Sequence, residues 1–252
     1  MRRRHFAIAV LAISLGAAAA ASASEVPAFQ TTALADKGRP EADARRDAAR
    51  KPAELLAFAG LKPGAKVADF IMGGGYFTRI LAAAVGPQGS VLAYQPAEFI
   101  QFRAAYGDEQ KAAVSAYSNV TADSSSFMKV VLPDNLDLVL TVQNYHDLYL
   151  APFPKGMAAR VNAEIYQSLK PGGVYLIVDH AATAGSGLSA ANTLHRIDVA
   201  AVKSEVEAAG FKLVAESPML AASADPHTDN VFSPAIRGKT DQFILKFVKP
   251  LK

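Results

Sequence analysis

Histidines occur beside acids in the second half of the chain. His146 is directly followed by Asp147, and His180 directly follows Asp179. His195 comes soon after the second pair. Imidazole titrates near neutral pH, so a histidine can take a proton from a reacting oxygen or nitrogen atom. We therefore predict a catalytic group made of His146, Asp147, His180 and His195. His146 or His180 would be the general base, and His195 would orient the substrate.

The same part of the chain offers ligands for a metal ion. Asp147, Asp179 and His180 could hold a divalent cation that binds a diol-like substrate. The chain has no cysteine, which excludes disulfides, thiolate zinc sites and cysteine nucleophiles. We predict the histidine base and no metal. The metal site stays an alternative, as does a purely structural role for each of these side chains.

Three consecutive glycines, Gly73, Gly74 and Gly75, follow an apolar stretch that contains Asp69. Glycine allows a tight turn from a strand into a helix and a close approach of the main chain to a ligand. The turn therefore predicts a ligand site beyond the end of the strand. Close packing of the following helix on the sheet would require glycines as well, so this packing role remains open.

Short apolar segments alternate with helical patterns along the chain. Strands are expected at 66–71, 90–95, 117–120, 136–142, 174–179, 211–216 and 242–248. Helices are expected from residue 41 and at 52–59, 76–85, 97–114, 157–169 and 199–209. This alternation is typical of an α/β fold with a mainly parallel sheet, and the last two strands predict an antiparallel pair at one end. Ligands bind beyond the carboxyl ends of such strands, where the glycine turn and the histidines fall.

From residue 41 onward the chain resembles the class I S-adenosylmethionine-dependent methyltransferases. Residues 67–76, with the three glycines, look like their first motif. Residues 136–140 look like their fourth strand, and 169–173 like the turn before the fifth. The resemblance implies a Rossmann-like sandwich with a seven-stranded sheet and an antiparallel last strand. It also implies methyl transfer from S-adenosylmethionine to a small-molecule acceptor. More narrowly, the chain resembles an exported bacterial group of predicted methyltransferases.

The resemblance also implies which residues contact the cofactor. Asp69 would orient the glycine turn or reach the amino-acid end of the cofactor. Asp123 and Ser124 would lie near adenine, and Gln143 near the methionine portion. The full set is Asp69, Gly73, Gly74, Gly75, Gln95, Asp123, Ser124 and Gln143.

Two residues depart from the pattern of this superfamily. Ile71 stands where the first glycine of the motif is usual, and Gln95 stands where an acid holds the ribose hydroxyls. A neutral amide makes weaker hydrogen bonds than a carboxylate. The alternative function is therefore a non-catalytic or altered-ligand binding protein on the same scaffold. A nicotinamide-dependent oxidoreductase is disfavoured, because the turn lacks the G-x-G-x-x-G spacing.

Residues 1–23 have the pattern of a cleaved export signal. Arg2, Arg3 and Arg4 precede an apolar run that ends in an Ala-Ser-Ala exit. This pattern predicts an exported, periplasmic protein, through a general secretory or a twin-arginine route. No later stretch is long and apolar enough to predict a membrane span after signal cleavage.

The three arginines of the leader account for the formal net charge of +3. Without them, basic and acidic residues balance, so the mature chain offers no basic surface for nucleic acid and we predict no nucleic-acid partner. Residues 24–40 are expected to form a flexible arm, and 41–252 a single domain. Arg45, Arg46, Arg50 and Lys51 are expected on a solvated face, with a flap over the cofactor as the alternative. Residues 218–241 are expected to form a lid over the site. The sequence does not indicate the oligomeric state.

Overall fold

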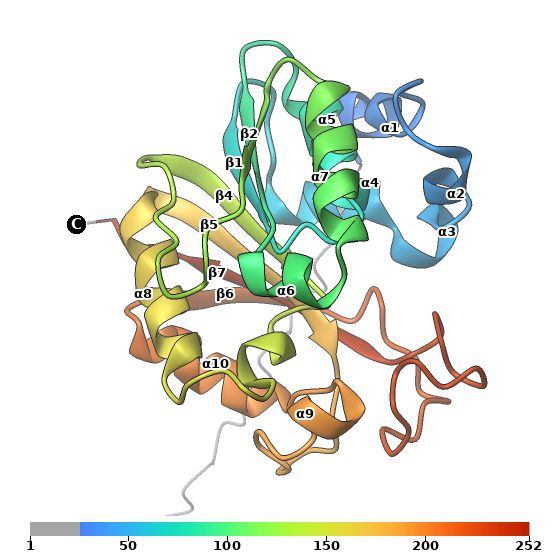
Figure 1. Cartoon of the computed structure of the whole chain (residues 1–252), viewed down its shortest axis with the longest axis vertical. Coiled ribbons are helices and arrows are strands. Elements are labelled where there is room, and N and C mark those ends of the chain that lie inside the picture. Colours follow the sequence, from blue (N-terminus) through green and yellow to red (C-terminus); the bar gives the residue numbers. More distant parts are fainter. Residues whose placement is uncertain (1–25, 252) are drawn as a thin grey trace, which may run out of the picture.

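The protein, described here by a computed structural model of residues 26–251, is built on one seven-stranded sheet (Figure 1). The strands are β1 (Lys66–Phe70), β2 (Ser90–Tyr94), β3 (Val120–Asp123), β4 (Leu136–Val142), β5 (Leu169–His180), β6 (Lys212–Ser217) and β7 (Gln242–Val248). Their order is β3-β2-β1-β4-β5-β7-β6, and β7 runs antiparallel to both of its neighbours while the other pairs are parallel. The predicted α/β class and antiparallel last strand are confirmed. The predicted export signal lies outside the described residues.

Helices cover both faces of the sheet (Figure 1). They are α1 (Ala28–Leu34), α2 (Glu41–Ala44), α3 (Asp47–Arg50), α4 (Pro52–Ala59), α5 (Tyr76–Val85), α6 (Ala97–Phe102), α7 (Ala105–Ser115), the 3-10 helix η1 (His146–Tyr149), α8 (Met157–Ser168), α9 (Ala191–Leu194) and α10 (Val199–Ala208). Successive residues of a strand face opposite sides of the sheet. In β5, Leu176 and Val178 pack with α1, α4 and α5, whereas Tyr175 and Ile177 pack with α8 and α10. Within residues 26–251, every helix is too short or too polar to cross a bilayer.

Local signals set the ends of several helices. Pro52 begins α4, and Gly60 follows it in the left-handed conformation, with a φ of 81°. The side chain of Asp198 accepts a hydrogen bond from the main-chain N–H of Ala200 and caps α10. These helices begin where the sequence predicted, because the caps depend on residues that adjoin them in the chain.

Three expectations about the elements are wrong. The arm expected at 24–40 contains α1, which packs on α5 and buries Ala33. The strand expected at 117–120 begins only at Val120, because the main chain before it forms a turn in which the Val120 N–H donates to the Tyr117 carbonyl oxygen at 3.2 Å. The helix expected at 97–114 is broken at Arg103, which has an extended main chain and separates α6 from α7.

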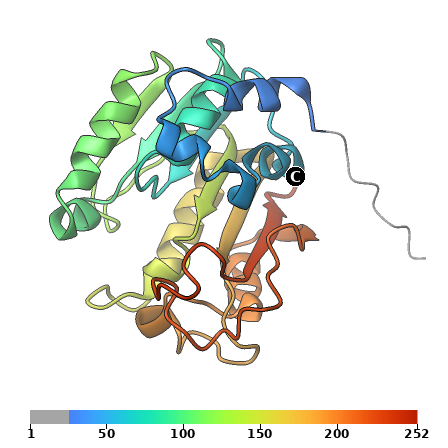
Figure 2. The same cartoon turned by 90° about the vertical axis from the view of Figure 1, so that its right-hand side faces the viewer.

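The segment 218–241 forms neither helix nor strand and is fastened by a buried ion pair. Arg196 is fully buried, and its guanidinium donates two hydrogen bonds, of 2.8 and 2.9 Å, to the carboxylate of Asp225. The same carboxylate accepts from the main-chain N–H of Asp241, at the far end of the segment. In Figure 2 this red segment and the blue helices α2 and α3 lie on the side that faces the viewer.

We predict that Asp225→Asn destabilises the protein by about 3–5 kcal/mol, because the change leaves the buried Arg196 charge uncompensated. Glu216→Gln is the matched control, since Glu216 pairs with Lys203 at a half-exposed position. That change should cost less than about 1 kcal/mol. Urea unfolding of both variants measures the difference, and equal losses would show that the buried pair does not anchor the segment.

Candidate functional site

His146 begins η1, beyond the carboxyl end of β4, and is held by a buried carboxylate of β5. Its main-chain N–H donates to Asp179 Oδ2 at 2.7 Å, and its ring Nδ1 lies 2.8 Å from Asp179 Oδ1. The other ring nitrogen, Nε2, lies 3.2 Å from Asp147 Oδ1. Burial lowers the pKa of His146, but the charges of Asp179 and Asp147 outweigh it and raise that pKa to about 10. Between these two carboxylates the ring keeps its proton at neutral pH.

His180, the last residue of β5, is in the opposite state. Its main-chain N–H donates to Asp179 Oδ1 at 2.8 Å, and its ring Nδ1 lies 2.8 Å from Thr240 Oγ1. Burial lowers the pKa of His180 to about 4 against the opposing charge of Asp179, and the positive charge of His146 adds to the decrease. The ring of His180 is therefore neutral at pH values where that of His146 is charged.

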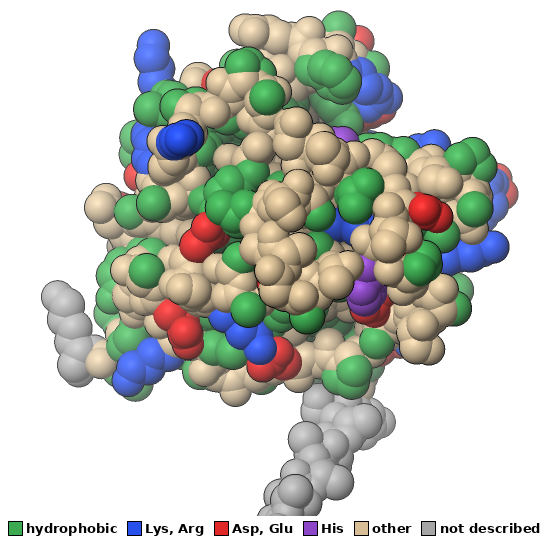
Figure 3. Space-filling model, turned by 90° about the horizontal axis from the view of Figure 1, so that it is seen from below, with side chains coloured by type: hydrophobic (Ala, Val, Ile, Leu, Met, Phe, Trp, Pro, Cys, Tyr) green, Lys and Arg blue, Asp and Glu red, His purple; other side chains and the backbone are tan. Residues whose placement is uncertain are grey.

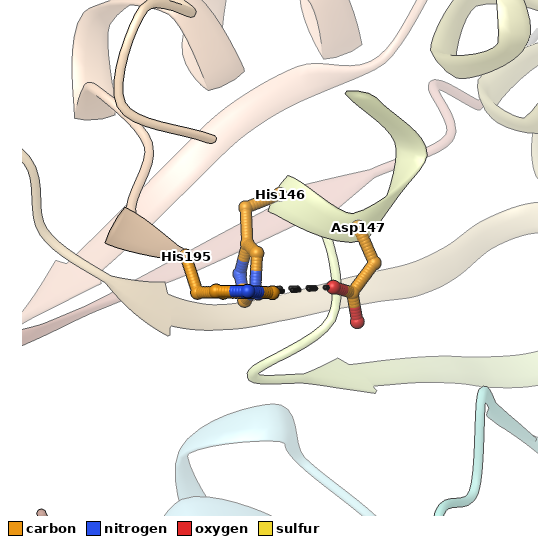
Figure 4. A group of neighbouring side chains, drawn as sticks. All are labelled: His146, Asp147 and His195. Atoms are coloured by element: carbon orange, nitrogen blue, oxygen red, sulfur yellow. Dashed lines mark ion pairs between the residues drawn. The ribbon is translucent and has the colours of Figure 1, made fainter. Parts of the chain in front are cut away.

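His195 follows α9 and completes the group. Its ring Nδ1 lies 3.8 Å from Asp147 Oδ1, and its ring centroid lies 5.3 Å from that of His146 (Figure 4). The centroids of His146 and His180 are 6.1 Å apart. The structure thus brings together all four residues of the predicted catalytic group, whose roles stay predictions. We call His146, Asp147, Asp179, His180 and His195 the histidine cluster.

The open side of the histidine cluster is at His195. The side chain of His195 is 23% exposed, whereas that of His146 is 3% exposed. Phe232, from the segment 218–241, covers one side of the His195 ring, with the two ring centroids 4.9 Å apart. Histidine atoms, drawn in purple, reach the surface in the view of Figure 3. His227 pairs instead with Asp241, at 2.9 Å.

Three contacts of the histidine cluster were not predicted from the sequence. Asp179 was grouped with its neighbour His180, although the carboxylate also holds His146. Thr240 and Phe232 carried no signal of their own, since both lie in a segment without helix or strand. Asp179 is a charged residue at the end of the apolar stretch 174–179. A charge in a buried strand needs partners, and this was the one indication of its role in the sequence.

The glycine turn between β1 and α5 has one open and one packed glycine. Gly73 has a φ of 54°, and its N–H donates to Gln95 Oε1 at 2.9 Å. Among the described residues, no atom beyond its chain neighbours lies within 4 Å of the position that a Cβ on Gly73 would take. A Cβ on Gly75 would lie only 3.0 Å from Ala113 Cβ. Packing therefore requires Gly75, whereas Gly73 leaves main chain accessible to a ligand.

Asp69 fastens β1 to α5 beneath this turn. The hydroxyl of Thr78 donates to Asp69 Oδ2 at 2.6 Å. Burial raises the pKa of Asp69 to about 6, while the Thr78 bond and the charge of Arg50 oppose the increase. Of the two roles that the resemblance implies for Asp69, its contacts favour orientation of the glycine turn.

Residues 143–147 run from the glycine turn to the histidine cluster. Asn144 Nδ2 donates to the carbonyl oxygen of Ile71 at 3.1 Å, and His146 follows two residues later. Adjacent Cα atoms are about 3.8 Å apart, so the Cα atoms of Asn144 and His146 lie at most about 8 Å apart. Gln143, in the same segment, accepts a hydrogen bond from Arg50 at 3.0 Å and donates one to Gln242 at 3.0 Å. The glycine turn and the histidine cluster are neighbours.

The helices α2 and α3 cover the start of α5. The guanidinium of Arg50 lies 4.5 Å from the ring centre of Tyr76, whose hydroxyl donates to Asp47 Oδ1 at 2.6 Å. Burial, with the nearby charge of Arg46, lowers the pKa of Arg50 to about 10, so the side chain stays charged at neutral pH. The expected solvated face is therefore wrong for Arg50. Arg46, one helical turn earlier, stays 49% exposed, so helix periodicity gave no signal for the burial of Arg50.

The remaining predicted cofactor residues lie at the end of β3. The carboxylate of Asp123 accepts hydrogen bonds from the main-chain N–H and the hydroxyl of Ser125, at 2.7 and 3.0 Å. The hydroxyl of Ser124 donates to Gln110 Oε1 at 2.7 Å. Both side chains shape the loop after β3, and their contact with adenine stays a prediction.

Comparisons with known proteins find similarity in structure. Neither a family model nor a curated protein matches the sequence. A methyltransferase from Aquifex aeolicus described as S-adenosylmethionine-dependent has a TM-score of 0.55, with 19% identity over 78% of this chain and 88% of that one. The [4+2]-cyclase SpnF has a TM-score of 0.56, with 19% identity over 86% of both chains. A possible exported protein from Bordetella parapertussis has a TM-score of 0.51, with 15% identity over 82% of this chain and 67% of that one.

The chain has the class I methyltransferase fold. Within this fold, Ile71 occupies the position of the usual first glycine and adopts the conformation that glycine would provide, with a φ of 65°. A β-branched residue in this region is strained by roughly 1–3 kcal/mol. The buried side chain of Ile71 packs in the core, which offsets the strain. This departure from the motif thus preserves the shape of the turn.

Gln95, the second departure, is fully buried. Its Oε1 holds Gly73, but its Nε2 has no hydrogen-bond partner among residues 26–251. A buried amide group without a partner is uncommon and needs an explanation. An open Gly73 next to an unpaired donor fits a ligand with hydroxyl groups, as the ribose of S-adenosylmethionine has.

We predict that Asp69→Asn changes how stability depends on pH. The raised pKa of Asp69 means that its contribution to stability is complete below about pH 3.8 and is lost as the pH rises through about 6. Asparagine does not titrate. Relative to the parent, the variant should therefore gain up to about 3 kcal/mol in unfolding free energy between about pH 4 and pH 7.5. Urea unfolding of the parent and the variant at both pH values measures this gain. If the difference in unfolding free energy between the two proteins is the same at both pH values, the raised pKa is contradicted.

Proposed function

We propose that this protein is an S-adenosylmethionine-dependent methyltransferase that acts on a small molecule. The observation that carries the proposal is the segment 143–147, which joins the glycine turn at Ile71 to the histidine cluster. Transfer between two bound molecules requires donor and acceptor side by side, and holding them so supplies much of the rate acceleration. The fold favours binding of the methyl donor at the glycine turn. The histidine cluster is then the place for the acceptor.

In this proposal, residues of the turn and its surroundings bind the donor. S-adenosylmethionine supplies a methyl group bound to a positively charged sulfur. Gly73 offers main chain at close approach, and the unpaired amide of Gln95 donates to a ribose hydroxyl. The guanidinium of Arg50, next to Gln143, attracts the carboxylate of the amino-acid portion. Asp123 and Ser124 at the end of β3 lie on the side proposed for adenine.

The histidine cluster prepares the acceptor. A base must have a free lone pair at the working pH. His180 is neutral, and when its Nδ1 donates to Thr240 Oγ1 the other ring nitrogen keeps a lone pair, so His180 is favoured over His146 as the base. Protonated His146 places positive charge where an acceptor oxygen loses its proton. The nearly closed surroundings of these rings, with only His195 partly exposed, favour a small acceptor over a polymer.

We also propose that the protein acts after export to the periplasm. The leader pattern at 1–23 supports this location, and so does the similarity to a possible exported protein. Mass spectrometry of the N-terminus of protein purified from cells tests it, with cleavage after Ala23 as the expected result. An intact leader on the bulk of the protein would contradict export.

The cofactor site is tested by a pair of glycine variants. Gly73 and Gly64 both have positive φ and both face open space, but Gly64 lies in the turn before β1, at the opposite end of the strand. Either change to alanine should cost about 1 kcal/mol or more in stability, because φ is positive. Only Gly73→Ala should weaken binding of S-adenosylhomocysteine, by about tenfold or more, which corresponds to about 1.4 kcal/mol.

Calorimetry with S-adenosylmethionine and S-adenosylhomocysteine provides the measurement. Binding by the parent and by Gly64→Ala, with loss in Gly73→Ala, supports the proposal. Equal binding by both variants would place the ligand elsewhere. No binding by the parent would indicate an altered-ligand protein on the methyltransferase scaffold.

A further inference from the structure

Three side chains of the histidine cluster present ligand atoms to one point. His146, Asp147 and His195 each offer one such atom, and these atoms all lie within 4.8 Å of one another (Figure 4). His146 and Asp147 come from η1, after β4, and His195 comes from the end of α9. Two elements that are distant in the chain therefore converge on one small volume.

The spacing of these atoms fits a first-row transition metal. Zinc binds imidazole nitrogen and carboxylate oxygen at about 2.0–2.2 Å in tetrahedral geometry, so two ligand atoms lie about 3.4 Å apart. Asp147 Oδ1 lies 3.2 Å from His146 Nε2 and 3.8 Å from His195 Nδ1. The two imidazole nitrogens lie within 4.8 Å of each other. Side-chain shifts of up to about 1 Å, with release of the His146 Nε2 proton to solvent, would place the three atoms on one ion.

Asp179 supplies the outer support that metal-bound histidines usually have. It is fully buried and contacts His146 Nδ1, the ring nitrogen that faces away from Asp147. A carboxylate in this position fixes the ring and leaves Nε2 for the metal. Asp147 and Asp179 together carry two negative charges, which balance a divalent cation.

His195 combines backbone strain with access to solvent. Its φ of 54° lies in the left-handed region, which is costly for a residue with a side chain and persists where the surroundings impose it. Here the strain turns a ring nitrogen towards Asp147. Because His195 is the partly exposed member of the three, an ion can enter and leave on its side.

We propose that His146 Nε2, Asp147 and His195 Nδ1 bind a divalent transition metal of the zinc class, with Asp179 as the outer partner of His146. This grouping differs from the alternative that the sequence suggested, in which Asp179 and His180 were ligands. Two imidazoles and one carboxylate suit zinc, cobalt or nickel better than magnesium or calcium, which prefer oxygen ligands.

Three protein ligands leave at least one coordination position open. An open position on zinc takes water or an oxygen atom of a substrate. That this oxygen belongs to the methyl acceptor rests on the proposed function. Metal binding itself does not, and it can be measured without S-adenosylmethionine.

The test is calorimetric titration of the chelator-stripped full-length protein with Zn²⁺, in parallel with Co²⁺ followed by its visible absorption. We expect one ion per chain and a cobalt spectrum typical of four or five ligands. Asp147→Asn and His195→Asn should each weaken Zn²⁺ binding by at least about tenfold, and Asp179→Asn by about 10- to 100-fold. Asparagine at 195 tolerates the left-handed conformation, so this variant should fold.

His227→Ala is the matched control. His227 also pairs with an aspartate, Asp241, but lies outside the three ligands. Its loss should leave Zn²⁺ binding unchanged. Circular dichroism and urea unfolding confirm that each variant is folded.

Absence of stoichiometric Zn²⁺ binding by the parent would overturn the proposal, and so would an equal loss in His227→Ala and His195→Asn. Binding of S-adenosylhomocysteine is measured on the same samples. Cofactor binding by the parent protein without Zn²⁺ binding would contradict this inference alone. Metal binding without cofactor binding would contradict the proposed function alone.

Discussion

A single buried carboxylate organises the rim of the sheet. Asp179 accepts hydrogen bonds from the main-chain N–H groups of His146 and His180 and contacts the ring Nδ1 of His146. A buried charge is costly unless donors surround it, so these contacts hold the ends of β4 and β5 together. The same contacts leave His146 Nε2 facing Asp147. The proposed metal ligands follow from that orientation.

Two segments that are distant from each other in the chain close this rim. From the N-terminal side, α3 places Arg50 on Tyr76 and against Gln143. From the C-terminal side, the segment 218–241 brings Thr240 to His180 and Phe232 to His195. Buried or partly buried charged side chains hold both segments in place. The site is therefore enclosed by parts of the chain that the central sheet alone does not order.

The departures from the methyltransferase motif have different consequences. Ile71 keeps the backbone conformation of the glycine that it replaces, so the turn retains its shape. Gln95 retains the bond that holds Gly73 but offers a neutral amide where a carboxylate is usual. Only the second change alters what a ligand meets. A fold does not by itself determine chemistry, so methyl transfer is proposed from these side chains.

The sequence by itself determined most of the elements and the edge of the sheet at which the proposed site lies. Pro52, Gly60 and the Asp198 cap act on residues beside them, so the helix ends could be predicted from neighbours in the chain. Histidines after parallel strands had to reach one rim, because the carboxyl ends of such strands share an edge. Tertiary structure alone decided the partners. Asp179 meets His146 across 33 positions, and Arg50 meets Gln143 across 93. Such pairs depend on strand order and side-chain direction, which arise from packing of the whole sheet. No local sequence pattern therefore predicts them.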